Sequence, residues 1–101
     1  MTTPWNGTWD ISWENSQGRT ETAEMTVEVH PNGHGVGTYT HSEGTLDGGF
    51  TRGGKIFIGE WIQNNYRGYF AFILTSDTSF YGVWTNSQDA DGRPWTGTKR
   101  Q

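Results

Sequence analysis

Polar and apolar residues alternate along most of the chain, and this alternation predicts its secondary structure. The segment GTWDISWE at 7–14 has glycine, tryptophan and isoleucine at odd positions, and threonine, aspartate, serine and glutamate at even positions. Successive side chains of a strand point to opposite faces, so the pattern is typical of a strand with one buried face. Turn-forming clusters separate such segments. The pattern predicts eight strands, near 7–14, 22–30, 34–41, 44–52, 55–63, 66–75, 79–86 and 94–100.

The connections between these segments are short, which restricts the topology. A parallel pair of strands needs a long crossover, so short turns allow only antiparallel neighbours. No segment has a helical repeat of useful length. A meander that closes on itself also removes the two exposed edges of an open sheet. We therefore expect an all-β fold, an eight-stranded antiparallel up-and-down barrel, formed by residues 1–101 as a single domain.

Glycine stands two residues before an aromatic residue six times in the chain. Residues i and i+2 share a strand face, so each glycine and its ring lie on the same side. In the first strand that side is the apolar one, which predicts that the pairs face the barrel interior. Glycine relieves crowding where a small barrel coils tightly. The pairs are Gly7 and Trp9, Gly37 and Tyr39, Gly48 and Phe50, Gly59 and Trp61, Gly68 and Phe70, and Gly82 and Trp84.

Several short motifs recur near aromatic positions of the predicted strands: GTW at 7–9, GTY at 37–39, tryptophans at 61 and 84, and WTGTKR at 95–100. In these motifs the chain resembles the calycins, the superfamily of lipocalins, fatty-acid-binding proteins and avidins. The resemblance implies an eight-stranded meander barrel with a ligand cavity, in which Tyr39 takes the place of a ligand-contacting tyrosine. It concerns architecture, because Ile11 stands where avidins have a polar biotin contact. Calycins place an arginine against the first-strand tryptophan; here alternation directs Lys99 inward and Arg100 outward.

Aromatic side chains dominate the predicted interior, with a few polar groups among them. A few polar groups in an apolar concavity are typical of a small-molecule site. We therefore expect a binding protein for a small apolar or aromatic ligand, with a pocket at one mouth of the barrel above the small residue Gly48. The expected ligand-binding residues are Tyr39, His41, Phe50, Trp61, Gln63 and Trp84.

Two other classes of function remain open. A barrel enzyme of the isomerase or cyclase type would use His41 as its acid or base, because histidine titrates near neutrality. A lectin would use the tryptophans Trp5 and Trp95 at the rim, beside Asn6 and Asp91. No nucleophile, phosphate-loop or zinc-helix motif is present. His30 and His34 flank a turn without matching carboxylate or cysteine spacing, so we expect neither a metal nor a cofactor.

The outward face of the second half of the chain is unusually apolar. It carries Ile56, Ile58, Ile62, Ile73 and Val83, whereas the first two strands expose acidic and hydroxyl side chains. A contiguous exposed apolar patch marks an interaction surface, and most soluble oligomers are symmetric homomers. We predict a homodimer or homotetramer formed through strands five to seven.

Composition excludes some partners. The 101 residues carry a net charge of −4, and the seven lysines and arginines are scattered, which argues against nucleic acid and anionic membranes as partners. There is no cysteine and hence no disulfide or thiolate metal site. No leader or membrane-spanning segment is evident, so we expect a cytoplasmic protein.

Overall fold

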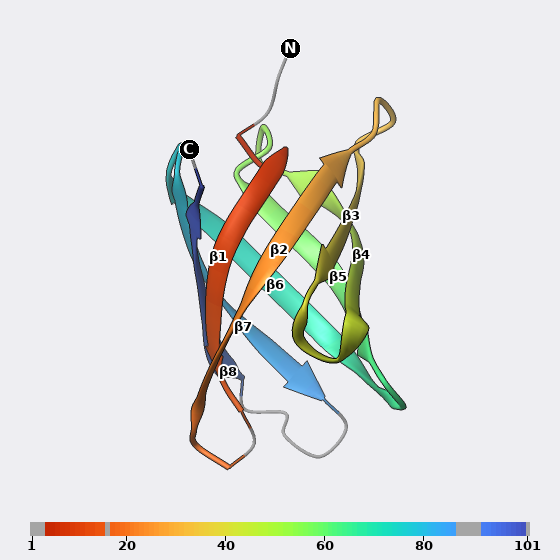
Figure 1. The fold of residues 1–101 in the computed structure, drawn as a ribbon. Coiled ribbons are helices and arrows are strands. Elements are labelled where there is room, and N and C mark those ends of the chain that lie inside the picture. The colour runs from red at the N-terminus through yellow and green to blue at the C-terminus, as the bar shows by residue number, and fades with distance from the viewer. Residues whose placement is uncertain (1–3, 16, 87–91, 101) are drawn as a thin grey trace.

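Eight strands follow one another along the chain and pair in sequence order (Figure 1). The computed structural model describes residues 4–15, 17–86 and 92–100. Apart from one short 3₁₀ turn, η1 (His41–Glu43), the regular elements among these residues are strands. The strands are β1 (Gly7–Glu14), β2 (Thr20–Val29), β3 (His34–Tyr39), β4 (Gly44–Thr51), β5 (Ile56–Gln63), β6 (Tyr66–Ser76), β7 (Ser79–Asn86) and β8 (Arg93–Lys99).

The first and last strands pair with each other and close the sheet into a barrel. β1 pairs antiparallel with β2 on one side and with β8 on the other, where Trp9 lies opposite Lys99 and Trp13 opposite Trp95. Closure gives every strand two hydrogen-bonded neighbours and leaves no open edge. The all-β, eight-stranded antiparallel meander barrel predicted from the sequence is therefore confirmed.

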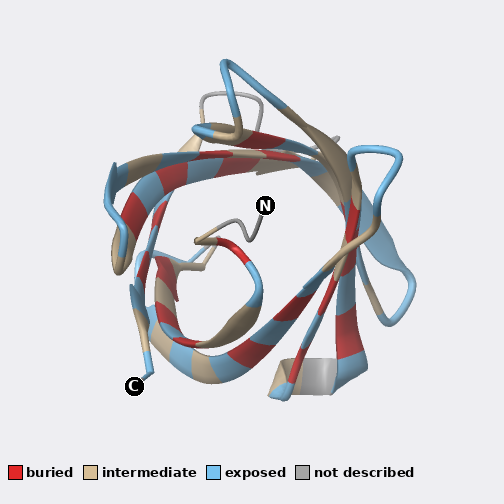
Figure 2. Cartoon of the chain, turned by 90° about the horizontal axis from the view of Figure 1, so that it is seen from above, coloured by how far each residue is buried: buried red, intermediate tan, exposed pale blue. Residues whose placement is uncertain are grey.

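Burial alternates along the strands as the sequence pattern predicts. In the view along the barrel, buried and exposed residues follow one another on each strand (Figure 2). In β1, Trp9, Ile11 and Trp13 are buried and Asp10 is exposed. The interior is filled mainly by rings: Trp5, Trp9, Trp13, Tyr39, Phe57, Trp61, Phe70, Phe72, Phe80, Trp84 and Trp95, with Ile11, Met25, Val27 and Leu46 between them.

Four glycines of the repeated glycine-x-aromatic pairs lie where neighbouring strands approach most closely. A Cβ at any of these positions would overlap a backbone carbonyl oxygen of the adjacent strand. The close approach allows a small barrel to coil tightly around its aromatic core, and only glycine permits it. These residues are Gly48, Gly59, Gly68 and Gly82.

One strand ends earlier than the alternation predicts. β3 stops at Tyr39, because the backbone of Thr40 is already helical (φ −76°, ψ −17°). Thr40 makes the last contacts with β2: its amide donates to the Glu24 carbonyl (3.0 Å), and its hydroxyl accepts from the Glu24 amide (3.1 Å). The chain then turns through η1, where Glu43 has the left-handed value φ 52°. The prediction that this strand continues to His41 is wrong. The other strand boundaries lie within two residues of the predicted ones.

The N-terminal residues 4–6 close one end of the barrel, the upper end in Figure 1. Trp5 lies inside it with 0% of its surface exposed. The ammonium group of Lys99 holds this segment by donating to the Pro4 carbonyl (2.8 Å), and it lies 5.9 Å from the centre of the Trp9 ring. Arg100 is on the outer surface, paired with Asp10 and Glu24. The predicted directions of Lys99 and Arg100 are both confirmed.

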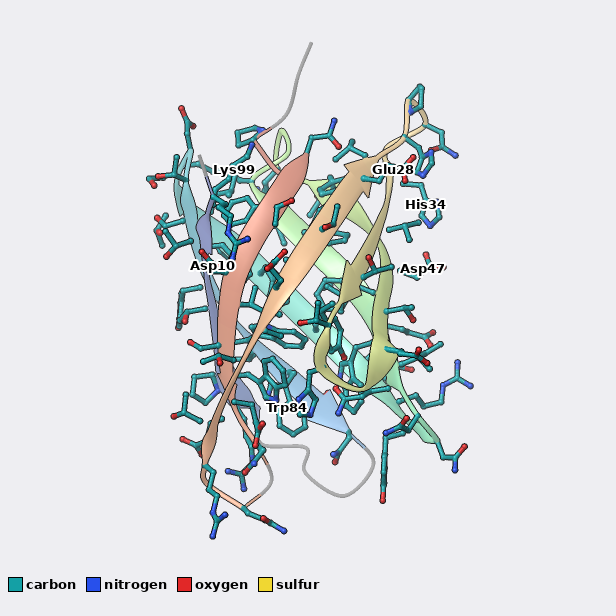
Figure 3. The ribbon with its side chains drawn as sticks, in the orientation of Figure 1. Asp10, Glu28, His34, Asp47, Trp84 and Lys99 are labelled. Atoms are coloured by element: carbon teal, nitrogen blue, oxygen red, sulfur yellow. The ribbon has the colours of Figure 1, made fainter. Side chains whose placement is uncertain are left out.

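The outer surface differs between the two halves of the barrel. On β3 and β4, His34 Nε2 lies 2.5 Å from Asp47 Oδ1, on the outer side that Figure 3 shows. The described residues contain no group of three or more side chains placed to hold a metal ion. They also contain no helix of the length and apolar character needed to cross a membrane. Every large apolar side chain that they expose lies on β5 to β7.

Candidate ligand site at the open end of the barrel

A cavity of about 280 Å³ opens at the end of the barrel opposite Trp5. It lies where β1, β3, β5 and β7 end, the lower end in Figure 1, and Figure 3 marks this end with Trp84. Four indoles and two phenols form most of its wall, and three amide side chains complete it. The lining residues are Trp13, Asn15, Tyr39, Trp61, Gln63, Tyr66, Trp84, Asn86 and Trp95.

Backbone carbonyl groups fix the two indoles on one wall. Trp61 Nε1 donates to the Thr85 carbonyl (2.9 Å), and Trp84 Nε1 donates to the Glu14 carbonyl (3.0 Å). The two ring centres are 5.6 Å apart, and the ring planes are at 89°. Edge-to-face contact is a preferred arrangement of aromatic pairs. Because the protein already accepts a hydrogen bond from both N–H groups, a ligand need not supply an acceptor for either indole and can contact their ring surfaces.

The opposite wall is formed by Trp13, Tyr39 and Trp95. Trp13 and Trp95 are cross-strand partners with ring centres 5.4 Å apart, and Tyr39 meets both rings edge to face at 5.9 and 5.7 Å. Trp95 Nε1 is buried, and none of the described residues accepts a hydrogen bond from it. Trp95 is therefore held by packing alone, unlike Trp61 and Trp84.

Tyr39 supplies the main polar contact inside the site. Its hydroxyl donates to Gln63 Oε1 (3.0 Å) and so bridges β3 and β5 across β4. Burial raises the pKa of the Tyr39 phenol, because the phenolate would be poorly solvated there. The hydroxyl stays protonated at neutral pH, so Tyr39 acts as a neutral hydrogen-bonding group.

The glycine beside Tyr39 is Gly44, and not Gly48, above which the pocket was predicted. Tyr39 and Gly44 are cross-strand partners, and a Cβ on Gly44 would overlap the Tyr39 ring and hydroxyl. Gly48 instead lies against the backbone of β5 at Ile58. A ring that covers a glycine on the neighbouring strand is a known way to fix register in a sheet.

Two residues expected in the pocket lie elsewhere. His41 is in η1 and its ring packs edge to face on Trp13 (5.1 Å), with Nδ1 3.7 Å from Glu21 Oε2, outside the cavity wall. Phe50 points inward, but the β4 register places it opposite Phe57, against Trp5 at the closed end. The prediction that both face one pocket with Tyr39 is corrected by these positions.

The rim tryptophans expected for a lectin are not available at the surface. Trp5 is 0% exposed at the closed end, and Trp95 is 3% exposed in the wall of the cavity. Asn6 is exposed, and Asp91 lies outside the described residues. A sugar platform at the rim would need exposed ring faces, which neither tryptophan offers.

Sequence reasoning did not place five of the lining residues in this pocket. Trp95 was considered only for the rim site of a lectin, and Trp13 was expected on the inner face of the first strand. Their cross-strand pairing brings both to this mouth. Asn15, Tyr66 and Asn86 stand at or just beyond strand ends at the same mouth. In an antiparallel meander, the end of each odd-numbered strand and the start of the next strand lie at the same mouth. This rule could have identified the three residues from the predicted strand boundaries. Asn15 also orders the β1–β2 turn, since its Oδ1 accepts from the amides of Gln17 and Arg19.

Comparison with known proteins gives the fold and no family. No family model and no curated protein sequence matches the chain. Among solved structures, it is similar to a redesigned β-barrel with a TM-score of 0.81 and 17% identity, over 97% of this chain and 93% of that one. It is also similar to two further redesigned β-barrels, mFAP1 and mFAP0, each of which is bound to DFHBI. Their TM-scores are 0.77 and 0.76, both at 17% identity over 97% of this chain, and 95% and 100% of theirs. The calycin resemblance of the sequence stays a prediction beyond the fold.

Proposed function

We propose that the protein binds a small, planar, uncharged molecule in the cavity at the open end. The observation that carries the proposal is this cavity of about 280 Å³, which is walled by indole and phenol rings of the buried core. Binding sites for small molecules are concave and mostly apolar, with a few polar groups that fix orientation. Tyr39 and Gln63 supply those groups here.

The wall favours a planar and uncharged ligand. Trp61 and Trp84 direct ring surfaces and edges toward the space, and such surfaces contact another aromatic ring well. None of the described lining residues is Asp, Glu, Lys, Arg or His. A charged ligand buried among neutral groups would lose its hydration without gaining a counter-charge. The two DFHBI-bound barrels, similar in fold, support the use of this architecture for a small ligand.

A pair of tyrosines on β6 tests the proposal without disturbing the core. Tyr66 is 64% exposed and lines the cavity, whereas Tyr69 is 66% exposed and lies outside it. Coumarin, a neutral planar two-ring compound, is a suitable probe in titration calorimetry. Loss of one aromatic contact costs about 0.5–1.5 kcal/mol, or roughly two- to tenfold in Kd. We expect this loss for Tyr66→Ala and none for Tyr69→Ala. No binding of coumarin or similar neutral planar probes, or equal losses in both variants, would contradict the proposal.

We also propose that two or four copies associate through β5 to β7. Six large apolar side chains are exposed on this outer face: Ile58, Ile62, Tyr69, Ile73, Tyr81 and Val83, each at 40–66%. An aromatic side chain has about 150–250 Å² of surface, so the two tyrosines alone expose about 180–300 Å². The four aliphatic side chains add to this area, toward the roughly 800 Å² per partner of a standard interface.

Charge also favours a second copy as the occupant of this face. Arg67 and Glu60 pair at 3.0 Å within it, so the face carries both signs, although the chain as a whole has a net charge of −4. Arg67 of one copy can therefore meet Glu60 of another across a two-fold axis. The opposite side of the barrel exposes Asp10, Glu24 and Glu28, and the cation Arg100, which pairs with the first two, leaves this cluster net negative. Copies would repel there more than on β5 to β7.

Light scattering at several concentrations tests the association. The wild type should give a multiple of 11.4 kDa. Replacing Ile58 and Ile73 together by Glu should give a folded monomer, because buried unpaired carboxylates oppose the interface. Thr26→Glu, at an exposed position of β2, is the matched control and should leave the mass unchanged. A wild type that stays monomeric at high concentration would refute the association.

A further inference from the structure

The side chain of Trp5 occupies the closed end of the barrel as a bound molecule would. It is 0% exposed, although it belongs to no strand and precedes β1. Five rings surround it, and each comes from a different strand. Their centres lie 5.5–6.5 Å from that of Trp5: Trp9 of β1, Phe50 of β4, Phe57 of β5, Phe72 of β6 and Phe80 of β7.

A backbone carbonyl helps to fix the orientation of the Trp5 indole. Trp5 Nε1 donates to the Gly54 carbonyl (2.6 Å) in the turn between β4 and β5. The chain around Trp5 is tied down separately. Its own carbonyl accepts from Trp9 Nε1 (2.9 Å), and the Asn6 side chain accepts from the Val29 amide (2.9 Å). The chamber and the segment that delivers Trp5 into it are therefore distinct parts of the structure.

The chamber keeps its walls without Trp5. Phe50 stacks on Phe57 at 4.6 Å, and Phe72 stacks on Phe80 at 4.4 Å, and all four lie in paired strands. Removing the indole would leave an apolar space with one carbonyl oxygen that lacks its donor. Apolar cavities of this kind take up aromatic molecules, and a partly buried acceptor that has lost its donor favours a ligand that donates to it.

We infer that the closed end is a second aromatic binding site, which the Trp5 side chain fills. When this side chain is removed or displaced, the site takes a free indole-type molecule: planar, uncharged, with two fused rings and one N–H that donates to Gly54. This site is separate from the cavity at the open end and shares none of its lining residues. It does not depend on the function proposed for that cavity.

The test compares indole with benzofuran on the wild type and on Trp5→Gly. Benzofuran has the shape of indole, but an oxygen replaces the N–H. At ten times its Kd for this site, indole should raise the Tm of Trp5→Gly by about 6–11 °C more than that of the wild type, because the open cavity contributes equally to both proteins. Benzofuran should bind Trp5→Gly about two- to tenfold more weakly than indole, because it leaves the Gly54 carbonyl without a donor.

Each outcome decides the inference. If Trp5→Gly is unfolded alone, the same comparison is made by refolding it: recovery of the native circular dichroism spectrum with indole supports the site. Absence of both binding and recovery overturns it. An equal effect of indole on the wild type and on Trp5→Gly would place the ligand at the open end and overturn the inference. Equal affinity for indole and benzofuran would refute the role of the Gly54 carbonyl as the selecting acceptor.

Discussion

Gly44→Ala should damage the ligand site and the stability of the barrel together. The backbone of Gly44 (φ −70°, ψ 151°) is open to any residue, so the substitution adds only a methyl group. That methyl would overlap the ring and hydroxyl of Tyr39, its cross-strand partner. Tyr39 must therefore leave its position between Trp13 and Trp95 and lose its hydrogen bond to Gln63.

The expected loss follows from these two effects. Forcing an extra methyl into a packed core costs about 1–3 kcal/mol, and one neutral hydrogen bond contributes about 0.5–1.5 kcal/mol. Because a displaced Tyr39 can reach solvent at the mouth, we expect the lower part of the combined range, about 2 kcal/mol. For a domain of this size that corresponds to a fall in Tm of about 8–16 °C.

Gly49→Ala on the same strand is the matched control. A Cβ at Gly49 meets only the Gly33 carbonyl at an ordinary 3.6 Å. Replacing such a glycine by alanine stabilises a protein by about 0.4–1 kcal/mol or leaves it unchanged. Urea unfolding followed by tryptophan fluorescence measures both free energies of unfolding, and coumarin titration measures the site. Equal stability of the two variants, or unaltered coumarin binding by Gly44→Ala, would refute the assigned packing of Tyr39.

Two further predictions concern the closed end and the titration of Tyr39. Lys99→Met removes the hydrogen bond to the Pro4 carbonyl and the cation near Trp9, so it should lower the free energy of unfolding by about 2 kcal/mol. The control Lys55→Met, in an exposed turn, should change this free energy by less than about 0.5 kcal/mol. Because burial raises the pKa of Tyr39 in the folded state, the unfolded chain loses that proton first above about pH 10. Stability should then fall with pH by up to about 1.4 kcal/mol per unit from this residue. Tyr39→Phe should show a correspondingly shallower loss in urea unfolding between pH 9 and 11, and an unchanged slope would contradict the burial of the phenol.

The strands could be predicted because each has one buried face and lies between clear turns. Alternation alone gave the inward direction of Tyr39, Trp61, Gln63 and Trp84, and all four line the cavity. It failed for His41, because a 3₁₀ turn breaks the alternation after β3 and the side chain no longer follows strand parity.

To predict how far along the barrel axis a residue lies, the register of its strand must be known, as well as the face to which its side chain points. Phe50 has the inward parity that was predicted, but it lies six residues after Gly44, toward the other end of β4. The β4 register puts Gly44 beside Tyr39 at the open end and Phe50 beside Phe57 at the closed end. Trp5 was harder to place, since it precedes the first alternating segment and no periodicity tells which way it points. Its burial follows from tertiary contacts with strands far along the chain.

Indole resonances in a ¹H–¹⁵N spectrum give the most direct test of the proposed ligand site. Trp13, Trp61, Trp84 and Trp95 line the open cavity, whereas Trp5 and Trp9 lie at the closed end. Titration with coumarin should shift the indole N–H signals of the first four and leave those of Trp5 and Trp9 in place. Shifts confined to Trp5 and Trp9, or no shift at any indole up to the solubility limit of coumarin, would contradict a ligand site at the open end.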